Sequence, residues 1–345
     1  MPDHSFRMEA WTIQERDGIR SLALAAEPQP NPAAGEVLVR IRAVSLNYRD
    51  LTTLDAQRPG NLPPPLIPCS DGAGEVIGVG TGVTRFHAGD RVAGIFFRDW
   101  ISGPFELRHH KAALGGSVHG MLREFVALPE AALVSVPAQL SFKEAATLPC
   151  AAVTAWQALF TRGGLRAGET VLVLGTGGVS VFALQLATAA GARVIVTSSS
   201  DEKLERARTL GAWATVNYQT TPDWDAEVWR LTEKRGVDHV VEVGGPGTLG
   251  KSMNSTTASG QIALIGVLTG FGPPEASLFP IVARNVRLDG IYVGSRADFK
   301  ALNSFLTEHQ LRPVIDRVFP FAEAPAAFAH LRGATHFGKV VISVS

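Results

Sequence analysis

Two different hydrophobic patterns divide the chain. From about residue 8 to 135, short stretches in which apolar and polar residues alternate are separated by Gly, Pro and Asp turns. In one of them Val39, Ile41 and Ala43 alternate with two arginines, as expected for a strand with one face in water. Further strands are expected at 74–79, 91–95 and 122–128. This part of the chain is therefore predicted to be an antiparallel β domain.

From about residue 151 to 295, continuous apolar runs alternate with segments of helical periodicity, such as the apolar face of Leu204, Ala207 and Leu210. Six strands are expected near 171–174, 193–197, 214–217, 239–243, 261–265 and 286–293. Apolar strands that alternate with helices are typical of a parallel sheet covered on both faces. The predicted fold class is thus α/β, with a doubly wound six-stranded sheet after the antiparallel domain.

Beyond residue 296 we expect a helix at 297–308, a second helical stretch and a terminal strand at 340–344. The expected domains are 1–150 for substrate binding and catalysis, 151–295 for a dinucleotide, and 296–345 as a segment that returns to the first domain. The segment 96–118 is a long connection, and connections of that length are usually functional lids or partly disordered.

A glycine-rich turn follows the apolar run 171–174, in the order Gly175, Thr176, Gly177, Gly178, Val179, and leads into a helical stretch. Such a turn needs unusual backbone angles, and a pyrophosphate on a helix N-terminus needs backbone without side chains in the way. These five residues are predicted to hold a dinucleotide; a turn without a ligand is the alternative. Ser180 stands where a third glycine is usual, which predicts looser helix packing or a hydroxyl free for the pyrophosphate.

The second strand ends in Ser198, Ser199 and Ser200, where a site for an unphosphorylated ribose would place Asp or Glu. The missing carboxylate favours NADP(H) over NAD(H), with Lys203 and Tyr218 as further contacts. As alternatives, Lys203 is an exposed helix lysine and Tyr218 a sheet-end aromatic residue.

The turns after the fourth and fifth strands lie at the carboxyl edge of the sheet, where ligands bind. Gly244, Gly266 and Val267 in these turns are predicted to line the ribose and nicotinamide, although each glycine can also serve only to form a loop.

Composition narrows the partners. The 345 residues include 32 basic and 32 acidic ones, which argues against nucleic acid or an anionic membrane as the main partner. No apolar run is long enough to cross a bilayer, and the N-terminus lacks the pattern of a secretory signal. The 2 cysteines are too few for a disulfide framework, so a cytoplasmic location is expected, with a small-molecule substrate.

Several motifs resemble those of the medium-chain dehydrogenase/reductase superfamily, and the resemblance covers nearly the whole chain. They are Gly72-Ala73-Gly74-Glu75-Val76, Gly78-Val79-Gly80, Ala88-Gly89-Asp90-Arg91-Val92 and His336-Phe337-Gly338-Lys339-Val340-Val341. The resemblance implies a GroES-like β domain and a Rossmann domain. It further implies that Thr154 lies near the nicotinamide, that Gly294, Ser295, Phe337 and Lys339 close over the cofactor, and that strand 286–293 pairs across a homodimer.

Zinc-dependent members of this superfamily hold a catalytic zinc with Cys, His and Cys. In register, these positions are Asn47, Ser70 and Cys150 here, and the four cysteines of the structural zinc site are absent. Because a catalytic zinc requires three protein ligands, no metal is expected, as in the quinone oxidoreductase-like branch. An alternative metal site would consist of Cys69, Cys150 and a histidine of 96–118. If no metal is bound, the two cysteines are expected to be small buried thiols, and His109 and His110 are expected to be a solvated pair.

Without zinc, hydride transfer depends on positioning and on hydrogen-bond donors near the developing oxyanion. By the same register, Asn47 is expected to hold the substrate oxygen or the cofactor and Tyr48 to donate a proton. Alternatively, the Asn47 side chain only hydrogen-bonds the neighbouring backbone, and Tyr48 only forms an aromatic wall of the pocket. Asp50 is expected to fix the local backbone or to pair with Arg49.

The leading functional hypothesis is an NADPH-dependent reductase of quinones, enones or related carbonyls. A zinc-independent alcohol or aldehyde dehydrogenase and a non-catalytic nucleotide-binding protein are the alternatives.

Overall fold

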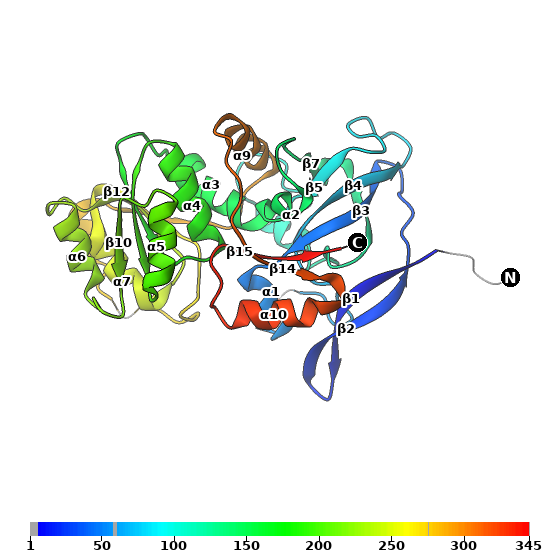
Figure 1. The fold of residues 1–345 in the computed structure, drawn as a ribbon, viewed down its shortest axis with the longest axis horizontal. Helices are drawn as coiled ribbons and strands as arrows, with labels where there is room; N and C mark the ends of the chain where they lie inside the picture. The colour runs from blue at the N-terminus through cyan, green and yellow to red at the C-terminus, as the bar shows by residue number, and fades with distance from the viewer. Residues whose placement is uncertain (1–5, 58–60, 275, 345) are drawn as a thin grey trace. The chain divides into compact units, whose positions relative to one another are not determined.

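A computed structural model describes residues 6–57, 61–274 and 276–344 (Figure 1). The chain forms two compact units, each with its own sheet. The β unit comprises Met1–Val153 and Gly294–Ser345, and the α/β unit comprises Thr154–Val293. The α/β unit is therefore one continuous segment inserted into the sequence of the β unit.

The β unit is built on a seven-stranded sheet in the order β14-β15-β3-β4-β5-β7, with β6 paired to β3. The strands are β3 (Glu36–Ser45), β4 (Asp71–Val79), β5 (Arg91–Gly94), β6 (Phe125–Pro129), β7 (Leu133–Ser135), β14 (Ile315–Pro320) and β15 (Lys339–Ser343). Strands β1 (Arg7–Arg16) and β2 (Ile19–Pro28) form a separate antiparallel hairpin. The antiparallel domain expected from the sequence is confirmed, and the C-terminal strand β15 pairs with β3.

Helices α1 (Tyr48–Leu54), α2 (Phe142–Ala145), α9 (Arg296–Glu308) and α10 (Ala324–Arg332) complete the β unit. Its core includes Val39 and Ile41 of β3, Val76 of β4 and Val340 of β15. These residues come from both ends of the chain, so the C-terminal segment is an integral part of this core.

The segment 96–118 is an ordered lobe, because aromatic side chains give it a small core of its own. Phe97 lies against Trp100 and Phe105, with ring centroids 6.1 and 5.3 Å apart. His109 stacks on Trp100 at 5.8 Å and its Nδ1 lies 2.8 Å from Oδ1 of Asp99. The expectation of a solvated histidine pair is therefore wrong for His109, which is buried, and correct for His110, which is exposed.

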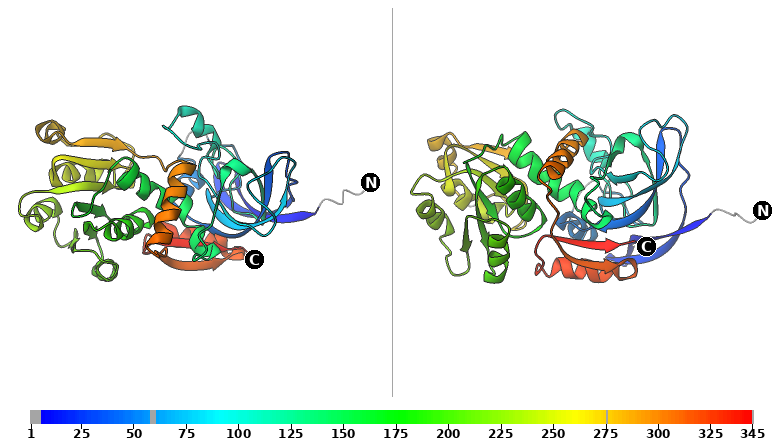
Figure 2. Two further views of the ribbon diagram at one scale, coloured as in Figure 1. Left: turned by 90° about the horizontal axis from the view of Figure 1, so that it is seen from above. Right: turned by 45° about the horizontal axis from the view of Figure 1, so that its top comes forward.

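The α/β unit contains a six-stranded, wholly parallel sheet in the order β10-β9-β8-β11-β12-β13. Its strands are β8 (Thr170–Leu174), β9 (Arg193–Ser198), β10 (Ala214–Asn217), β11 (Val237–Glu242), β12 (Thr256–Leu264) and β13 (Arg287–Gly290). Helices α4 (Gly178–Ala189), α5 (Asp201–Thr209), α6 (Trp224–Leu231), α7 (Pro246–Ser255) and α8 (Phe279–Arg284) connect them and flank the sheet (Figure 2).

This strand order confirms the doubly wound sheet, with its switch point between β8 and β11. Five of the strands lie where the hydrophobic pattern predicts them. The sixth is shorter than expected, because the chain leaves the sheet after Gly290 and Val293 has a positive φ of 60°.

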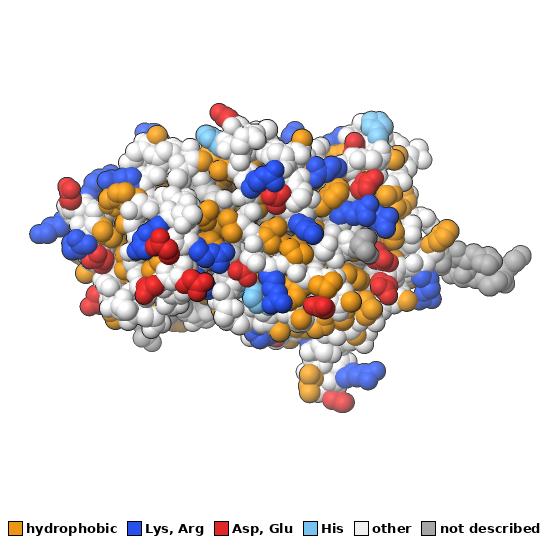
Figure 3. Space-filling model, in the orientation of Figure 1, with side chains coloured by type: hydrophobic (Ala, Val, Ile, Leu, Met, Phe, Trp, Pro, Cys, Tyr) orange, Lys and Arg blue, Asp and Glu red, His pale blue; other side chains and the backbone are white. Residues whose placement is uncertain are grey.

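Charged side chains of both signs are interspersed on the face drawn in Figure 3, in keeping with a formal net charge of +0. Among the described residues, none of the helices has both the length and the apolar character needed to cross a membrane.

Candidate functional site: a dinucleotide turn and a buried polar cluster

The glycine turn after β8 has the geometry of a phosphate site. Gly175 has a φ of +73°, a conformation that favours glycine. Gly177 is the N-cap of α4, and a Cβ built there meets no atom within 4 Å. Thr176, Gly178 and Val179 complete the turn, whose free backbone N–H groups and helix dipole favour an anion. The turn therefore fits the pyrophosphate of a dinucleotide.

Ser180 belongs to the architecture of this turn. Its buried Oγ donates a hydrogen bond of 2.7 Å to the carbonyl of Leu174. The Ser180 hydroxyl is therefore not free to bind the pyrophosphate, which was one of the two possibilities predicted from the sequence. The serine instead ties the first turn of α4 to the end of β8.

Ser198, Ser199, Lys203 and Tyr218 come from the carboxyl ends of β9 and β10 and the start of α5. The backbone N–H of Tyr218 donates to the carbonyl of Ser198 at 3.0 Å, and the Ser198 side chain is buried. Ser200 caps α5 by accepting from the Lys203 N–H at 3.3 Å. These contacts fix the backbone around the position where a ribose would lie.

A carboxylate that sequence reasoning overlooked stands beside these residues. Asp201 opens α5, and its Oδ1 accepts a hydrogen bond of 2.7 Å from the Asn217 amide. The amide ties this carboxylate to the end of β10. Asp201 lies in the first turn of the helix and not at the end of the strand, where the ribose-binding acid is expected from the sequence.

Glu242 at the end of β11 is a second residue that sequence reasoning missed. The side chain is fully buried and accepts hydrogen bonds from the N–H groups of Gly244 (2.7 Å) and Gly245 (3.0 Å). The hydroxyls of Thr248 (2.6 Å) and Ser252 also donate to it. The available signal was a carboxylate that directly follows the apolar pair Val240-Val241 at the end of the strand, since a buried charge requires partners.

Gly244, Gly266 and Val267 lie in the turns that Glu242 organises. A Cβ at Gly266 would lie 1.9 Å from the carbonyl oxygen of Val243, so the two turns approach too closely for a side chain. Glycine is therefore required at position 266 by the packing of the two turns, independently of any ligand.

The β unit contains a buried polar cluster just before α1. Lys339, which is 2% exposed, donates from Nζ to the carbonyl of Leu46 and to Oδ1 of Asn47, both at 2.6 Å. Because an ammonium can only donate, it fixes the amide oxygen of Asn47 toward itself. The amide nitrogen Nδ2 is left buried and makes no hydrogen bond of standard geometry with a described residue; the acceptor near it is the Asp71 carboxylate, whose pKa the Asn47 amide lowers. A buried donor without such a hydrogen bond is uncommon and marks a place where a ligand atom can accept.

Two aspartates adjoin this cluster. Asp50 accepts from the Asn47 N–H at 2.8 Å and pairs with Arg49 at 3.3 Å, so both expected roles of Asp50 are confirmed. Burial raises the pKa of Asp50 to about 6, although the nearby Arg49 charge opposes this. Burial also raises the pKa of Asp71, against the opposing effects of Lys339, Ser70 and the Asn47 amide.

The positions in register with a catalytic zinc site do not fit a zinc ion. Asn47 accepts from the Lys339 ammonium, and Ser70 donates from Oγ to Asp71 at 2.6 Å. Burial raises the pKa of the Cys150 thiol, which favours the protonated form that binds metal poorly. The described residues contain no group of three or more His, Cys, Asp or Glu placed to hold a metal.

The remaining predicted site residues lie as follows. Tyr48 is the first residue of α1 and is 44% exposed. Thr154 and Phe337 are buried. Ser295 caps α9, with its Oγ 2.6 Å from Oδ2 of Asp298, and a Cβ at Gly294 would lie 2.7 Å from Val153. Asn47 and Lys339 are thus brought together, whereas helix capping and packing account for Ser295 and Gly294.

Comparisons with known proteins identify the family. The alcohol dehydrogenase GroES-like domain matches residues 33–138, and the zinc-binding dehydrogenase domain matches residues 178–308. A zinc-type alcohol dehydrogenase-like protein of Schizosaccharomyces pombe is 45% identical over 316 residues, covering 90% of this chain and 91% of the relative. A 2-methylene-furan-3-one reductase of Solanum lycopersicum is 31% identical, covering 97% and 79%.

A crystal structure of a putative alcohol dehydrogenase from Sinorhizobium meliloti 1021 is also similar. It superposes with a TM-score of 0.92 at 44% identity and covers 99% of both chains. The protein is a member of the medium-chain dehydrogenase/reductase superfamily, an oxidoreductase of the alcohol dehydrogenase-like type whose relatives bind NAD(P).

Proposed function

We propose that the protein is a zinc-independent, NADPH-dependent reductase of conjugated carbonyl compounds, namely quinones and enones. The observation that carries the proposal is the buried amide of Asn47, whose oxygen is held by Lys339 and whose Nδ2, near the Asp71 carboxylate, makes no hydrogen bond of standard geometry with a described residue. A fixed, desolvated donor of this kind suits an oxygen that gains negative charge during reduction.

The cofactor is assigned to residues of the α/β unit. Gly175, Thr176, Gly177, Gly178 and Val179 would hold the pyrophosphate, and Ser198, Ser199, Lys203 and Tyr218 the phosphorylated ribose. Gly244, Gly266, Val267 and Thr154 are proposed to line the nicotinamide side. When bound, NADPH supplies the hydride.

The substrate oxygen is proposed to accept a hydrogen bond from Asn47 Nδ2. The Lys339 ammonium, 2.6 Å from Oδ1, polarises the amide and prevents it from flipping, so the donor faces one way. Lys339 is thereby a positioning residue. Tyr48, with its half-exposed side chain, is assigned the delivery of the proton, either directly or through water.

The side chains at the three positions that align with zinc ligands, Asn47, Ser70 and Cys150, also support zinc independence. An amide, a hydroxyl already donating to Asp71 and a thiol with a raised pKa stand beside an ammonium that would repel a cation.

The Solanum lycopersicum relative is named a 2-methylene-furan-3-one reductase, and a 2-methylene-furan-3-one is a conjugated ketone, which favours a conjugated substrate here. Reduction or oxidation of an isolated carbonyl is the second candidate, favoured by the alcohol dehydrogenase-like names of other relatives.

The test is to mix the purified protein with NADPH or NADH and a panel of quinones, enones and aldehydes, and to follow cofactor absorbance. Oxidation of NADPH by quinones or enones supports the proposal, and oxidation only by aldehydes supports the second candidate. Binding of NADPH without turnover of any class would contradict both and indicate a non-catalytic nucleotide-binding protein.

We further propose a cytoplasmic homodimer. Among the described residues, the edge strand β13 pairs only with β12, and α8 presents Phe279 (69% exposed) and Val282 (71% exposed) beside it in sequence. Unpaired edges and exposed apolar side chains favour pairing with a second copy. Light scattering that gives a monomer at micromolar concentration would contradict this assignment.

A further inference from the structure

A small pocket in the β unit contains an arginine that the proposed reaction does not use. The pocket encloses about 220 Å³ and is formed by the β1–β2 hairpin, the loop before β4 and the chain leading into β6. It is lined by Met8, Thr12, Glu27, Pro28, Pro30, Pro65, Ile67, His119 and Arg123.

Arg123 has no hydrogen-bond or ion-pair partner for its guanidinium among the described residues, and its Nε is buried. Burial lowers the pKa of Arg123 to about 10, which leaves it charged at neutral pH. Arg123 as a whole is half-buried, so the terminal nitrogens of the guanidinium stay accessible from the pocket. The pocket therefore contains a cationic group that a ligand anion can reach and pair with.

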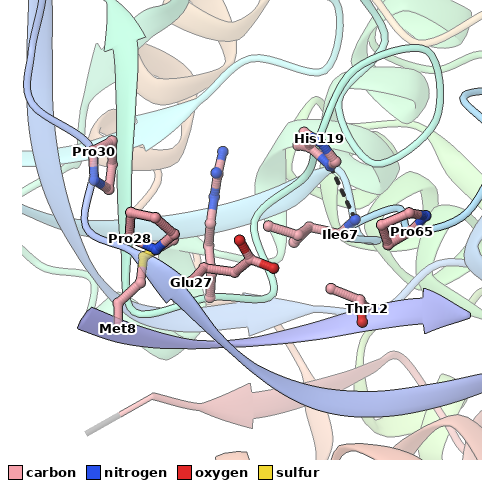
Figure 4. A pocket seen from close by; sticks show the side chains of 9 residues that line it. Met8, Thr12, Glu27, Pro28, Pro30, Pro65, Ile67 and His119 are labelled. Carbon is pink, nitrogen blue, oxygen red and sulfur yellow. Dashed lines mark hydrogen bonds between the residues drawn. The ribbon is translucent and has the colours of Figure 1, made fainter. Parts of the chain in front are cut away.

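Glu27 supplies the opposite charge in the same pocket. Its register on β2 places it across from Met8 on β1, and its carboxylate raises the pKa of both Arg123 and His119. It forms no ion pair with either residue at 4.0 Å or less. Figure 4 shows the Glu27 carboxylate between Met8 and Pro28 on one side and Ile67 and Pro65 on the other. A simple anion at Arg123 would face this carboxylate, whereas a ligand that also has a cationic group would match both charges.

His119, another lining residue, contributes a neutral donor to the pocket. Its Nδ1 accepts a hydrogen bond of 3.2 Å from the Ile67 N–H (Figure 4). Burial lowers the pKa of His119, so Nδ1 stays unprotonated at neutral pH and the ring proton is on Nε2.

We infer that this pocket binds a small zwitterion of the amino-acid type, with its carboxylate on Arg123, its ammonium on Glu27 and a compact apolar side chain against Met8, Ile67 and the prolines. The size agrees, because 220 Å³ is the space of about seven waters at about 30 Å³ each, below the range of drug-sized sites. The inference is independent of the proposed reductase activity.

Three ligands of similar size test the two charges separately. Valine has both charges, 3-methylbutanoate lacks the ammonium and isobutylamine lacks the carboxylate. Isothermal titration calorimetry is expected to give valine at least about tenfold tighter binding than either analogue, since each analogue loses one charge-assisted contact. Equal affinities of the three, or no heat of binding with any of them at about 10 mM, would overturn the inference.

Two substitutions test the residues. Arg123→Met should weaken valine binding by about tenfold or more, and Glu27→Gln should move the preference from valine toward 3-methylbutanoate. Arg40→Met, at an exposed arginine of β3, is the matched control and should leave valine binding unchanged. Valine affinity that is the same in the wild type, Arg123→Met and Glu27→Gln would refute the assignment.

Discussion

Replacing Asn47 by Asp isolates the hydrogen-bond donor proposed for catalysis. The two side chains have the same shape, so the oxygen that accepts from Lys339 at 2.6 Å is retained. Only Nδ2 is replaced, by an oxygen that accepts when ionised. The substitution therefore removes the donor without opening a cavity, but it also places a second carboxylate near Asp71; Asn47→Ala removes the donor without adding a charge.

The expected loss follows from the burial of this donor. Removing one preorganised donor from an oxyanion site lowers kcat by about 10²–10³, or about 2.7–4 kcal/mol of transition-state stabilisation. Asn47 is 8% exposed, so water has little access to replace the lost hydrogen bond. We expect the kcat/KM of Asn47→Asp for the best quinone or enone to fall within this range, and that of Asn47→Ala to fall comparably.

The assay is NADPH-linked reduction followed by absorbance, with NADPH affinity measured in parallel by fluorescence titration. NADPH affinity should stay unchanged, because the cofactor is assigned to residues of the α/β unit. Asn31→Asp, in an exposed loop, is the matched control and should keep full activity. If both Asn47 variants keep kcat/KM within about threefold of the wild type while folded, Asn47 is not the donor.

Lys339 adds a second test of the same arrangement. If Lys339 acts only by fixing the Asn47 amide, the double variant Asn47→Ala/Lys339→Met should lose little more activity than Asn47→Ala alone. Fully additive losses would mean that Lys339 contributes to the reaction by another route.

Three further predictions concern the nucleotide turn, cofactor preference and pH. Gly177→Ala should weaken NADPH binding while changing the melting temperature by only a few degrees, since its Cβ meets no protein atom; Gly175→Ala, at a φ of +73°, should destabilise the fold. An unchanged NADPH affinity of Gly177→Ala would place the pyrophosphate elsewhere. Ser198→Asp should shift preference toward NADH in steady-state assays, because a carboxylate repels the 2′-phosphate; an unaltered preference would assign selectivity to other residues. Asp50, with its pKa raised to about 6, binds a proton more tightly in the folded than in the unfolded state, so its contribution to stability is lost as pH rises from about 4 to about 6. Asp50→Asn should remove up to about 3 kcal/mol of this pH dependence in denaturant unfolding; an identical profile in both proteins would refute the assignment.

The parallel sheet could be predicted because its signal is local. A strand such as β8 is a short apolar run followed by turn residues, and its bounds agree to within one residue with the expected 171–174. The ordered lobe at 96–118 could not be predicted in the same way. Its stability depends on contacts such as those of Trp100 with Phe105 and His109, and aromatic residues in a loop have no periodicity that reveals their packing.

The candidate site was only partly predictable for the same reason. Sequence register selected Asn47, but its contact with Lys339 joins residues 292 positions apart, and no spacing rule predicts such a pair. Glu242 was missed because a carboxylate in a strand usually lies on the exposed face. Here it is buried, and its partners come from the turn and helix that follow it.

The pairing of β15 with β3 has a consequence for the order in which the protein is made. Ser45 on β3 donates from Oγ to Val340, 295 residues later, whereas the α/β unit is one uninterrupted segment, Thr154–Val293. During synthesis the α/β unit is complete on emergence of Val293, while the β unit still lacks the strand that carries Lys339. A nascent chain therefore acquires its nucleotide turn first, and the Asn47 donor is fixed only after β15 has emerged from the ribosome.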